Sequence, residues 1–158
     1  MTTYLKEDFL YDADLVLEDS LDTNGDVAAI VTSAAGSLLT VAQVIDLGDG
    51  LAEGYMIVDV DAIVEDTDEL YQIKLQGSNV TPFVTATTYD LAILELGAGE
   101  VLFNANAGTD VGAAGDRLVL PFRNEQNGEV YRYVRAYTLM SGTGESITAT
   151  MWLSIKRK

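Results

Sequence analysis

The sequence predicts an all-β fold, a β-sandwich or jelly-roll-like domain of seven to eight antiparallel strands with an extended N-terminal arm. The first observation is a period-two alternation of apolar and polar residues, which dominates from residue 37 onward, where no convincing helical period is found. The second is a pair of segments rich in β-branched and aromatic residues, 131–139 and 147–155, on either side of a short Gly-containing turn. These two segments are predicted to pair as the closing hairpin of the domain.

Residues 1–36 differ from the rest and are predicted as an arm that precedes a β-sandwich domain of residues 37–158. Acidic residues alternate irregularly with apolar ones in this segment, and the apolar spacing over 10–21 fits no single helical face. An extended arm that packs on its own domain or on a neighbour is therefore favoured over an amphipathic helix.

Further strands follow one another along the domain. Tyr71, Ile73 and Leu75 alternate with polar residues and predict a strand with one buried face. Pro121 indicates that its strand lies at a sheet edge, because proline has no N–H to donate to a neighbouring strand. Residues 97–115 are rich in small residues and predict a long loop that one short strand interrupts. The strands predicted before the hairpin are 38–44, 56–64, 71–76, 90–96 (mostly buried), 101–103 and 118–122.

The composition limits the chemistry that the chain can support. Its 158 residues are the length of one domain with its own core. It contains no Cys and no His, which excludes zinc sites built on those residues, Ser-His-Asp triads and Cys-His dyads. No window approaches the roughly 18 apolar residues of a membrane span, and the first residues do not resemble a signal peptide. We therefore predict no enzyme activity, no cofactor, no catalytic or metal-binding residue and no membrane partner.

The net charge of −16 is unevenly distributed. Residues 1–116 carry 22 acidic and two basic residues, a net −20, whereas residues 117–158 carry seven basic and three acidic residues, a net +4. A chain this acidic repels phosphate backbones, so no nucleic-acid partner is expected. The basic residues either neutralise acidic neighbours within the fold, which is the favoured interpretation, or form a patch that docks on an acidic protein surface.

Two acidic segments match metal-binding loops only in part. Residues 22–26 have the Asp-x-Asn-x-Asp start of a calcium loop, but Val27 stands where the loop needs Gly and Ser33 where it needs Glu. An acidic turn is favoured there. Residues 65–69 could collect a divalent ion weakly, yet a charged, solvated hairpin loop is favoured.

Three further features bear on ligand chemistry. Asp59 and Asp61 share one strand face, as a glycosidase pair would require, but a chain with 25 acidic residues contains such pairs by chance. Residues 48–54 have the wrong glycine spacing for a dinucleotide fingerprint and are predicted as a turn. Trp152, the single Trp, is a candidate sugar platform, subunit contact or second-layer core residue, and the last two are favoured.

A resemblance to a known family is carried by three segments: Val44–Gly48 ahead of an apolar strand, Tyr71–Ser78, and Tyr131–Arg135 with the turn at 142–144. In these segments, and in its order of strands from about residue 10 to residue 155, the chain resembles the capsid cement (decoration) proteins of tailed bacteriophages. The resemblance implies a sandwich or jelly-roll protein that forms homotrimers on the phage head and clamps neighbouring major capsid protein subunits. It also implies a location on the outer capsid surface of the virion, after synthesis in the host cytoplasm.

The expected function is thus capsid decoration and stabilisation, without catalysis. The apolar side chains of the arm are expected to lie across a neighbouring subunit, and the basic C-terminal third is expected to contact the capsid. The residues expected at capsid or subunit contacts are Tyr4, Leu5, Phe9, Leu10, Arg132, Arg135, Trp152, Lys156 and Arg157. The segment Tyr131–Arg135 also resembles the late strand of discoidin-type carbohydrate-binding sandwiches, so a carbohydrate-binding module is the alternative function.

Overall fold

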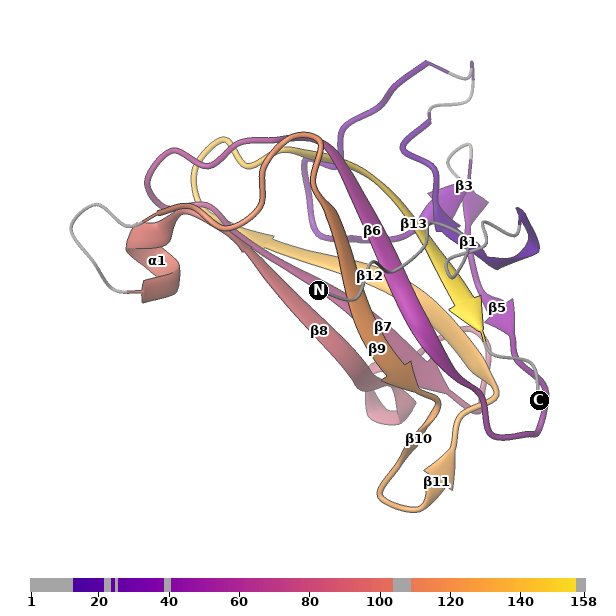
Figure 1. Cartoon of the computed structure of the whole chain (residues 1–158). Helices are drawn as coiled ribbons and strands as arrows, with labels where there is room; N and C mark the ends of the chain where they lie inside the picture. Colours follow the sequence, from indigo (N-terminus) through magenta and orange to yellow (C-terminus); the bar gives the residue numbers. More distant parts are fainter. Residues whose placement is uncertain (1–12, 22–23, 25, 39–40, 104–108, 156–158) are drawn as a thin grey trace, which may run out of the picture.

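Two antiparallel sheets packed face to face form the frame of the protein, as seen in a computed structural model (Figure 1). The structure describes residues 13–155 except 22–23, 25, 39–40 and 104–108. The first sheet contains, in spatial order, β1 (Val16–Glu18), β13 (Ile147–Ile155), β6 (Glu53–Ile63) and β9 (Arg117–Arg123). The second contains β2 (Ala34–Ala35), β12 (Tyr133–Ser141), β7 (Leu70–Ser78) and β8 (Tyr89–Gly97), and β5 (Ile45–Asp46) also pairs with β12.

Shorter elements complete the described part of the chain. Two small hairpins pair β3 with β4 and β10 with β11. The short elements are η2 (Ala13–Leu15), β3 (Ser37–Leu38), β4 (Val41–Ala42), η3 (Thr85–Thr87), α1 (Gly99–Phe103), β10 (Glu125–Gln126) and β11 (Glu129–Val130).

The strands follow a jelly-roll order, which confirms the predicted all-β sandwich. The chain passes from one sheet to the other between β1 and β2, between β5 and β6, and then after β6, β8, β9 and β12. Of the long strands, only β7 and β8 are consecutive in sequence and paired within one sheet. The sheet orders β1-β13-β6-β9 and β2-β12-β7-β8 that result are those of an eight-stranded jelly roll.

The predicted closing hairpin is wrong, because its two strands lie in different sheets. Strand β12 pairs with β7 and β13 pairs with β6, each along its full length. The turn between them therefore crosses from one sheet to the other. Alternation of apolar residues reports which face of a strand is buried, and it does not identify the strand beside it. Both strands satisfy their alternation equally well as partners in separate sheets.

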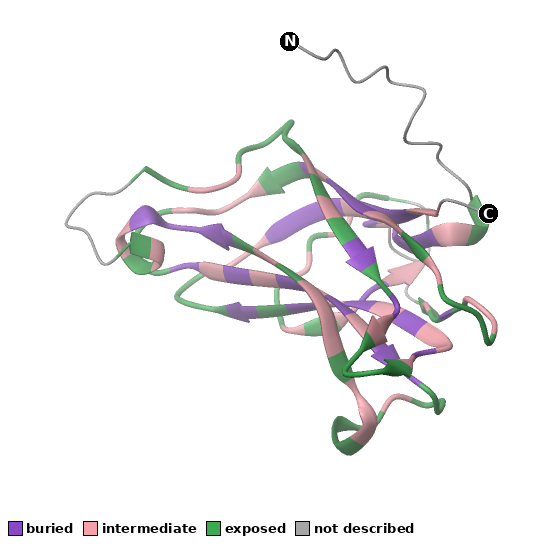
Figure 2. Cartoon of the chain, turned by 60° about the horizontal axis from the view of Figure 1, so that its bottom comes forward, coloured by how far each residue is buried: buried purple, intermediate pink, exposed green. Residues whose placement is uncertain are grey.

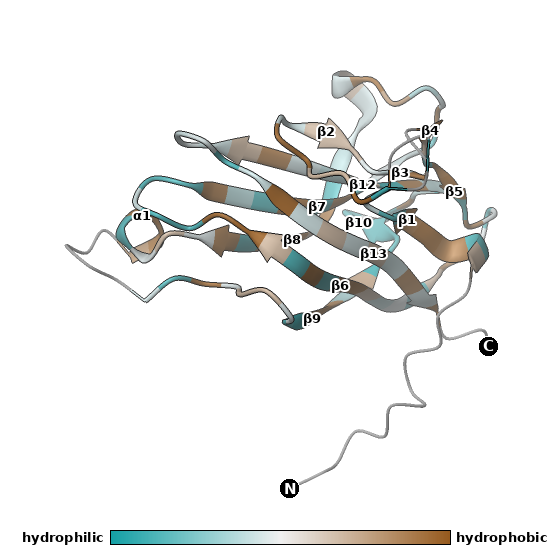
Figure 3. Cartoon of the chain, turned by 90° about the horizontal axis from the view of Figure 1, so that it is seen from above, coloured by the Kyte–Doolittle hydropathy of each residue, from teal (hydrophilic) through white to brown (hydrophobic). Residues whose placement is uncertain are grey.

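The core fills the space between the sheets. Figure 2 shows buried bands alternating with less buried ones, as along β7 and β12, and Figure 3 shows the strands coloured by hydropathy, with apolar and polar residues alternating. The predicted face of β7, which contains Tyr71, Ile73 and Leu75, is fully buried, so that prediction is confirmed. Each such side chain stabilises the fold by about 1.5–3 kcal/mol relative to exposure. The other strands contribute Met56, Val58 and Val60, Val134 and Ala136, and Ile147, Ala149, Met151 and Leu153.

The described part of the segment predicted as an arm lies on its own sandwich. Strand β1 pairs with β13, and Leu17 in β1 is fully buried in the core. Strand β2 pairs with β12, and Ile30 forms an isolated bridge with Ile147. The carboxylate of Glu18 accepts hydrogen bonds from the backbone N–H groups of Ser20 (2.8 Å) and Ser37 (2.9 Å). Residues 13–36 thus add strands to both sheets where they are described.

Among the other predicted strands, the edge position of one is confirmed and two are wrong. Pro121 lies in β9, whose neighbour in the sheet is β6 alone, so the predicted edge position is confirmed. The strand predicted at 101–103 is wrong, because these residues belong to α1, in which the N–H groups of Val101 and Leu102 donate to the carbonyl of Ala98. The single strand predicted over 38–44 is also wrong, since the described residues there pair in two-residue pieces. Strand β8 is less buried than predicted, with Ile93 49% exposed.

Candidate binding site on the second sheet

The β1 side of the outer face of the first sheet is covered by a second, smaller core layer, whereas Val119 and Pro121 of β9 on the same face are exposed. Val16, Trp152 and Ile57 lie opposite one another on β1, β13 and β6, and all three are buried. Leu38 and Tyr55 pack against them. Trp152 is 4% exposed, which places it in the second-layer core that was one of its favoured interpretations. A side chain buried within its own chain offers no surface to a partner, so Trp152 is withdrawn as a capsid contact.

The outer face of the second sheet is open by comparison. We call it the open face, and it is formed by Arg135, Tyr137 and Leu139 of β12, Gln72, Lys74 and Gln76 of β7, and Asp90, Ile93 and Glu95 of β8. Ile93 is 49% and Leu139 40% exposed, so two large aliphatic side chains stand in solvent between polar ones. The sheet register places Arg135 opposite Gln76, and Gln76 opposite Asp90. A rigid sheet therefore presents a mixed apolar, aromatic and charged surface.

A hollow of about 510 Å³ lies at one end of the open face, around Arg135. Its volume falls within the range of pockets that hold small ligands. The hollow lies where the segment between β7 and β8 meets β12 and β10, and we call it the Arg135 hollow. Besides Arg135 it is lined by three aromatic side chains and by hydroxyl and amide groups, from Phe83, Tyr89, Tyr137, Thr85, Thr88 and Gln126, together with Gln76 and Asp90 of the open face.

The Arg135 guanidinium is held by aromatic rings and one amide. Its central carbon lies 4.5 Å from the centroid of the Phe83 ring and 5.4 Å from that of Tyr137. Its Nε–H donates to Oε1 of Gln76 at 3.0 Å. Burial lowers the pKa of Arg135 from its ordinary value, with a smaller opposing effect from Tyr137. The side chain is therefore a partly desolvated cation with a fixed orientation.

Asp90 is engaged by neighbours other than Arg135. Its carboxylate accepts from Nζ of Lys74 and from Nε2 of Gln76, both at 2.9 Å. Gln76 thus bridges the cation and the carboxylate, because its oxygen accepts from Arg135 while its nitrogen donates to Asp90. The network fixes every side chain in this row of the sheet.

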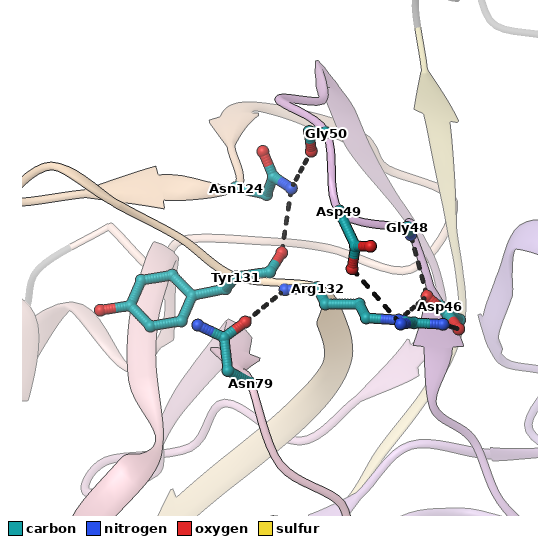
Figure 4. A network of polar contacts seen from close by, with 8 residues as sticks. All are labelled: Asp46, Gly48, Asp49, Gly50, Asn79, Asn124, Tyr131 and Arg132. Carbon is teal, nitrogen blue, oxygen red and sulfur yellow. Dashed lines mark hydrogen bonds and ion pairs between the residues drawn. The ribbon is translucent and has the colours of Figure 1, made fainter.

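Arg132, by contrast, pairs with carboxylates of its own chain (Figure 4). Its guanidinium donates to both carboxylate oxygens of Asp46, at 2.8 and 2.7 Å, and to Asp49 at 3.3 Å. Its backbone N–H donates to Oδ1 of Asn79 at 2.9 Å. The hydrogen bonds from Arg132 hold the pKa of Asp46 below its usual value. Arg132 therefore fixes the start of β12 to the loop before β6. Its side chain stays 42% exposed, and its role as a capsid contact remains a prediction.

The loops beside Arg132 are joined by the buried side chain of Asn124 (Figure 4). Its Nδ2 donates to the carbonyls of Gly50, at 3.0 Å, and Tyr131, at 2.9 Å. Its Oδ1 accepts from the N–H of Ala52 at 2.7 Å. Of the residues predicted as a turn at 48–54, residues 48–52 form a turn that the side chain of Asn124 ties to Tyr131, just before β12, whereas Glu53 and Gly54 already belong to β6.

Two more arginines pair within the chain. Arg117 binds both oxygens of Asp59, at 2.6 and 2.5 Å, and Arg123 lies 2.8 Å from Glu53. The favoured interpretation of the basic C-terminal third, neutralisation of acidic neighbours, is confirmed for Arg117, Arg123 and Arg132. Of the other predicted contact residues, Tyr4, Leu5, Phe9, Leu10, Lys156 and Arg157 lie outside the described residues.

The acidic loop at 65–69 is organised around its own carboxylate. Glu69 is 1% exposed, and its Oε2 accepts from the backbone N–H groups of Asp66 (2.7 Å), Thr67 (3.0 Å) and Asp68 (3.3 Å). The segment connects strands of different sheets, so it is not the predicted hairpin loop. Among the described residues, no group of three or more Asp or Glu side chains is placed to hold a metal ion. The acidic turn at 22–26 lies largely outside the described residues.

Glu65, at the end of the same connection, lies among other carboxyl groups. Burial and the nearby charges of Asp110 and Asp116 raise its pKa to about 7. Its Oε1 is enclosed and accepts no hydrogen bond from the described residues. Gly112 lies directly beside it, where an added Cβ would be 3.5 Å from this oxygen. The arrangement favours a protonated Glu65.

The comparisons with known proteins add no family. No protein-family model matches the chain, and no curated protein matches it either. Within the described ranges, the structure holds no helix long and apolar enough to cross a membrane. The open face and the Arg135 hollow are therefore the candidate functional surfaces. Sequence reasoning selected Arg135 but missed Phe83, Tyr89 and Gln126, because they come from distant segments and carry no local pattern.

Proposed function

We propose that the chain is a structural virion protein that decorates and stabilises a phage capsid by clamping neighbouring major capsid protein subunits, without catalysis. The observation that supports this most is the difference between the two outer faces. One is covered on its β1 side by the second core layer around Trp152, and the other displays Ile93, Tyr137 and Leu139 on a rigid sheet. Apolar and aromatic side chains on one rigid face offer area that a partner protein can bury, with the polar side chains around them as a rim.

The jelly-roll order is compatible with this role. Eight-stranded jelly rolls occur in viral capsid proteins and in lectins, so the architecture admits both functions under consideration. One fold supports many functions, so capsid decoration is favoured by the open face and by the resemblance of three segments to decoration proteins: Val44–Gly48, Tyr71–Ser78 and Tyr131–Arg135. In this proposal the open face contacts the major capsid protein, and three copies of the chain form a trimer.

The proposal is tested by cryo-electron microscopy of the virion together with decoration of undecorated heads. We expect the chain on the outer capsid surface. The double variant Ile93→Glu with Leu139→Glu places charges on the open face and is expected to lose at least about tenfold in affinity for heads. Val27→Glu with Val41→Glu adds the same charge at exposed positions outside this face and is the control. A chain found in the tail, or absent from particles, contradicts the proposal.

A carbohydrate-binding module is the second candidate function. The Arg135 hollow favours it, because its aromatic rings and its hydroxyl, amide and carboxylate groups are the kinds of group that bind sugars. Binding of free saccharides to the isolated chain distinguishes this function from capsid attachment, which needs none.

A further inference from the structure

Arg135 differs from every other arginine that the structure describes. Arg117, Arg123 and Arg132 each pair with at least one carboxylate of the chain. Arg135 forms no ion pair with any carboxylate of the described residues, although the chain carries 25 acidic residues. The nearest acid in its row, Asp90, is bound to Lys74 instead. Among the described residues, Arg135 is thus the one arginine without a carboxylate partner, and it lies in a hollow.

The orientation of Arg135 leaves its outer donors available. Of its five N–H donors, Nε–H is bound to Gln76, and the two Nη groups make no hydrogen bond to the described residues. Phe83 and Tyr137 lie close to the guanidinium and fix its plane. Two Nη groups in a fixed plane match the two oxygens of a carboxylate. Partial desolvation strengthens such a contact, because fewer waters compete for the same donors.

The rest of the hollow suits a sugar ring. Tyr89 is 41% exposed and is held in place by stacking on the buried Tyr131, with ring centroids 5.1 Å apart. Thr85 and Gln126 add hydroxyl and amide groups to the lining. A pyranose has apolar C–H faces that stack on aromatic rings and hydroxyl groups that bond to polar ones. The lining of the hollow combines the same two kinds of surface.

We propose that the Arg135 hollow binds a saccharide that bears a carboxylate, with the carboxylate on the Nη groups of Arg135 and the sugar hydroxyls on the polar lining. The inference rests on the second candidate function and specifies its ligand class. A phosphate group fits less well, because it concentrates about two negative charges at Arg135, beside Asp90, where a carboxylate places a single one. A uronic acid and a sialic acid share the required chemistry.

The test is calorimetric titration of the full chain with four saccharides. Trigalacturonate and sialyllactose carry the carboxylate, and maltotriose and lactose are neutral. We expect at least one acidic saccharide to bind, and neither neutral one to bind as tightly. Arg135→Gln should weaken the acidic ligand at least about tenfold, as expected for the loss of hydrogen bonds to a charged group. Arg135→Lys should retain part of the affinity, since its ammonium keeps the charge without the planar fork.

The control is Arg123→Gln, which removes an arginine that the chain already pairs with Glu53, and it should leave binding unchanged. Circular dichroism of every variant verifies that the fold is intact. Binding of trigalacturonate alone identifies a uronic acid, binding of sialyllactose alone identifies a sialic acid, and either supports the proposal. The proposal is overturned if neutral sugars bind with equal affinity and this binding is lost in Tyr89→Ala but not in Arg135→Gln. A carbohydrate-binding function would then still be supported. No binding of any saccharide overturns both.

Discussion

Arg132 and Arg135 lie close together in the sequence and have opposite surroundings. Arg132 is neutralised by Asp46 and Asp49 in a solvent-exposed network, whereas Arg135 is enclosed by two rings and an amide. The difference arises because the segment before β6 contacts the start of β12 but does not extend along that strand as far as Arg135. Substitution of Arg132 is expected to loosen that loop, and substitution of Arg135 to change ligand binding.

This contrast shows how far the sequence could predict the candidate site. Sequence reasoning named both arginines, since a basic segment in an acidic chain is visible from composition. It could not separate them, because a partner such as Asp46 is 86 residues from Arg132 in the chain. The aromatic neighbour Phe83 is likewise brought to Arg135 only by the pairing of β7 with β12.

Glu65 predicts a pH dependence of stability. A carboxyl whose pKa is higher in the folded chain than in the unfolded chain stabilises the fold at low pH. That contribution is lost as pH rises from about 4.5, its ordinary value, to about 7. Glu65→Gln keeps the side chain neutral, so we expect the variant to exceed the parent in stability at pH 8. Because Glu65 is partly exposed, solvent screening limits the gain to on the order of 1 kcal/mol.

The measurement is urea unfolding of parent and variant between pH 4.5 and pH 8. Asp66→Asn, an exposed neighbour on the same connection, is the control and should leave the pH profile unchanged. Glu18, whose pKa burial also raises, will retain some slope of the same sign in the Glu65→Gln variant. Parallel profiles of Glu65→Gln and parent across this range would show that the carboxyl does not act in this way.

At the scale of the element, the long strands were predictable and their neighbours were not. The buried face of β7 and the edge position of β9 follow from local patterns, namely alternation and a proline. The partner of β12 depends on the connection that follows it, and a short Gly-containing turn fits a hairpin and a sheet-to-sheet crossing equally well. The hydroxyl of Tyr71 helps to define the crossing, because it donates to the carbonyl of Val64 at 2.7 Å and accepts from the N–H of Ser146 at 3.0 Å.

Gly142 is expected to be essential for this crossing. Its φ is +129°, and an added Cβ would lie 2.6 Å from the carbonyl oxygen of Asp68 and 2.7 Å from Cα of Glu69. Backbone atoms cannot move aside cheaply, so Gly142→Ala should destabilise the fold by about 3 kcal/mol. Gly144 also has a positive φ, of +77°, but open space around it, and Gly144→Ala should cost about 1 kcal/mol.

Thermal and urea unfolding of the two variants measure these costs. Equal destabilisation by both substitutions would show that the positive φ alone determines the cost at this turn. The close approach of Gly142 to the 65–69 connection would then add nothing to that cost.

At the scale of the whole molecule, net charge opposes self-association. Copies that each carry −16 repel one another, and salt screens this repulsion over a Debye length of about 8 Å at physiological ionic strength. If the chain forms the proposed homotrimer through apolar contacts, the trimer should form at lower protein concentration as salt increases. Such contacts are not screened, and excluded salts such as sulfate strengthen them.

Sedimentation velocity at low and high sodium chloride, and in sodium sulfate, tests this dependence on the isolated chain. We expect a shift from monomer toward trimer at micromolar concentration as salt rises. A monomer under all three conditions would rule out a trimer formed before capsid attachment.

The pairing of β1 with β13 determines when the sandwich can close during folding. Leu17, in one of the earliest described strands, is buried only when the last described strand, residues 147–155, lies beside it. Most contacts between strands likewise join segments far apart in the chain, so loop-closure entropy opposes folding before native contacts offset it. We expect refolding on the millisecond-to-second scale that is typical of all-β sandwiches. During synthesis on the ribosome, β6 therefore has neither of its sheet neighbours until β9 has been made. Strand β1 has no sheet neighbour until synthesis has passed residue 155.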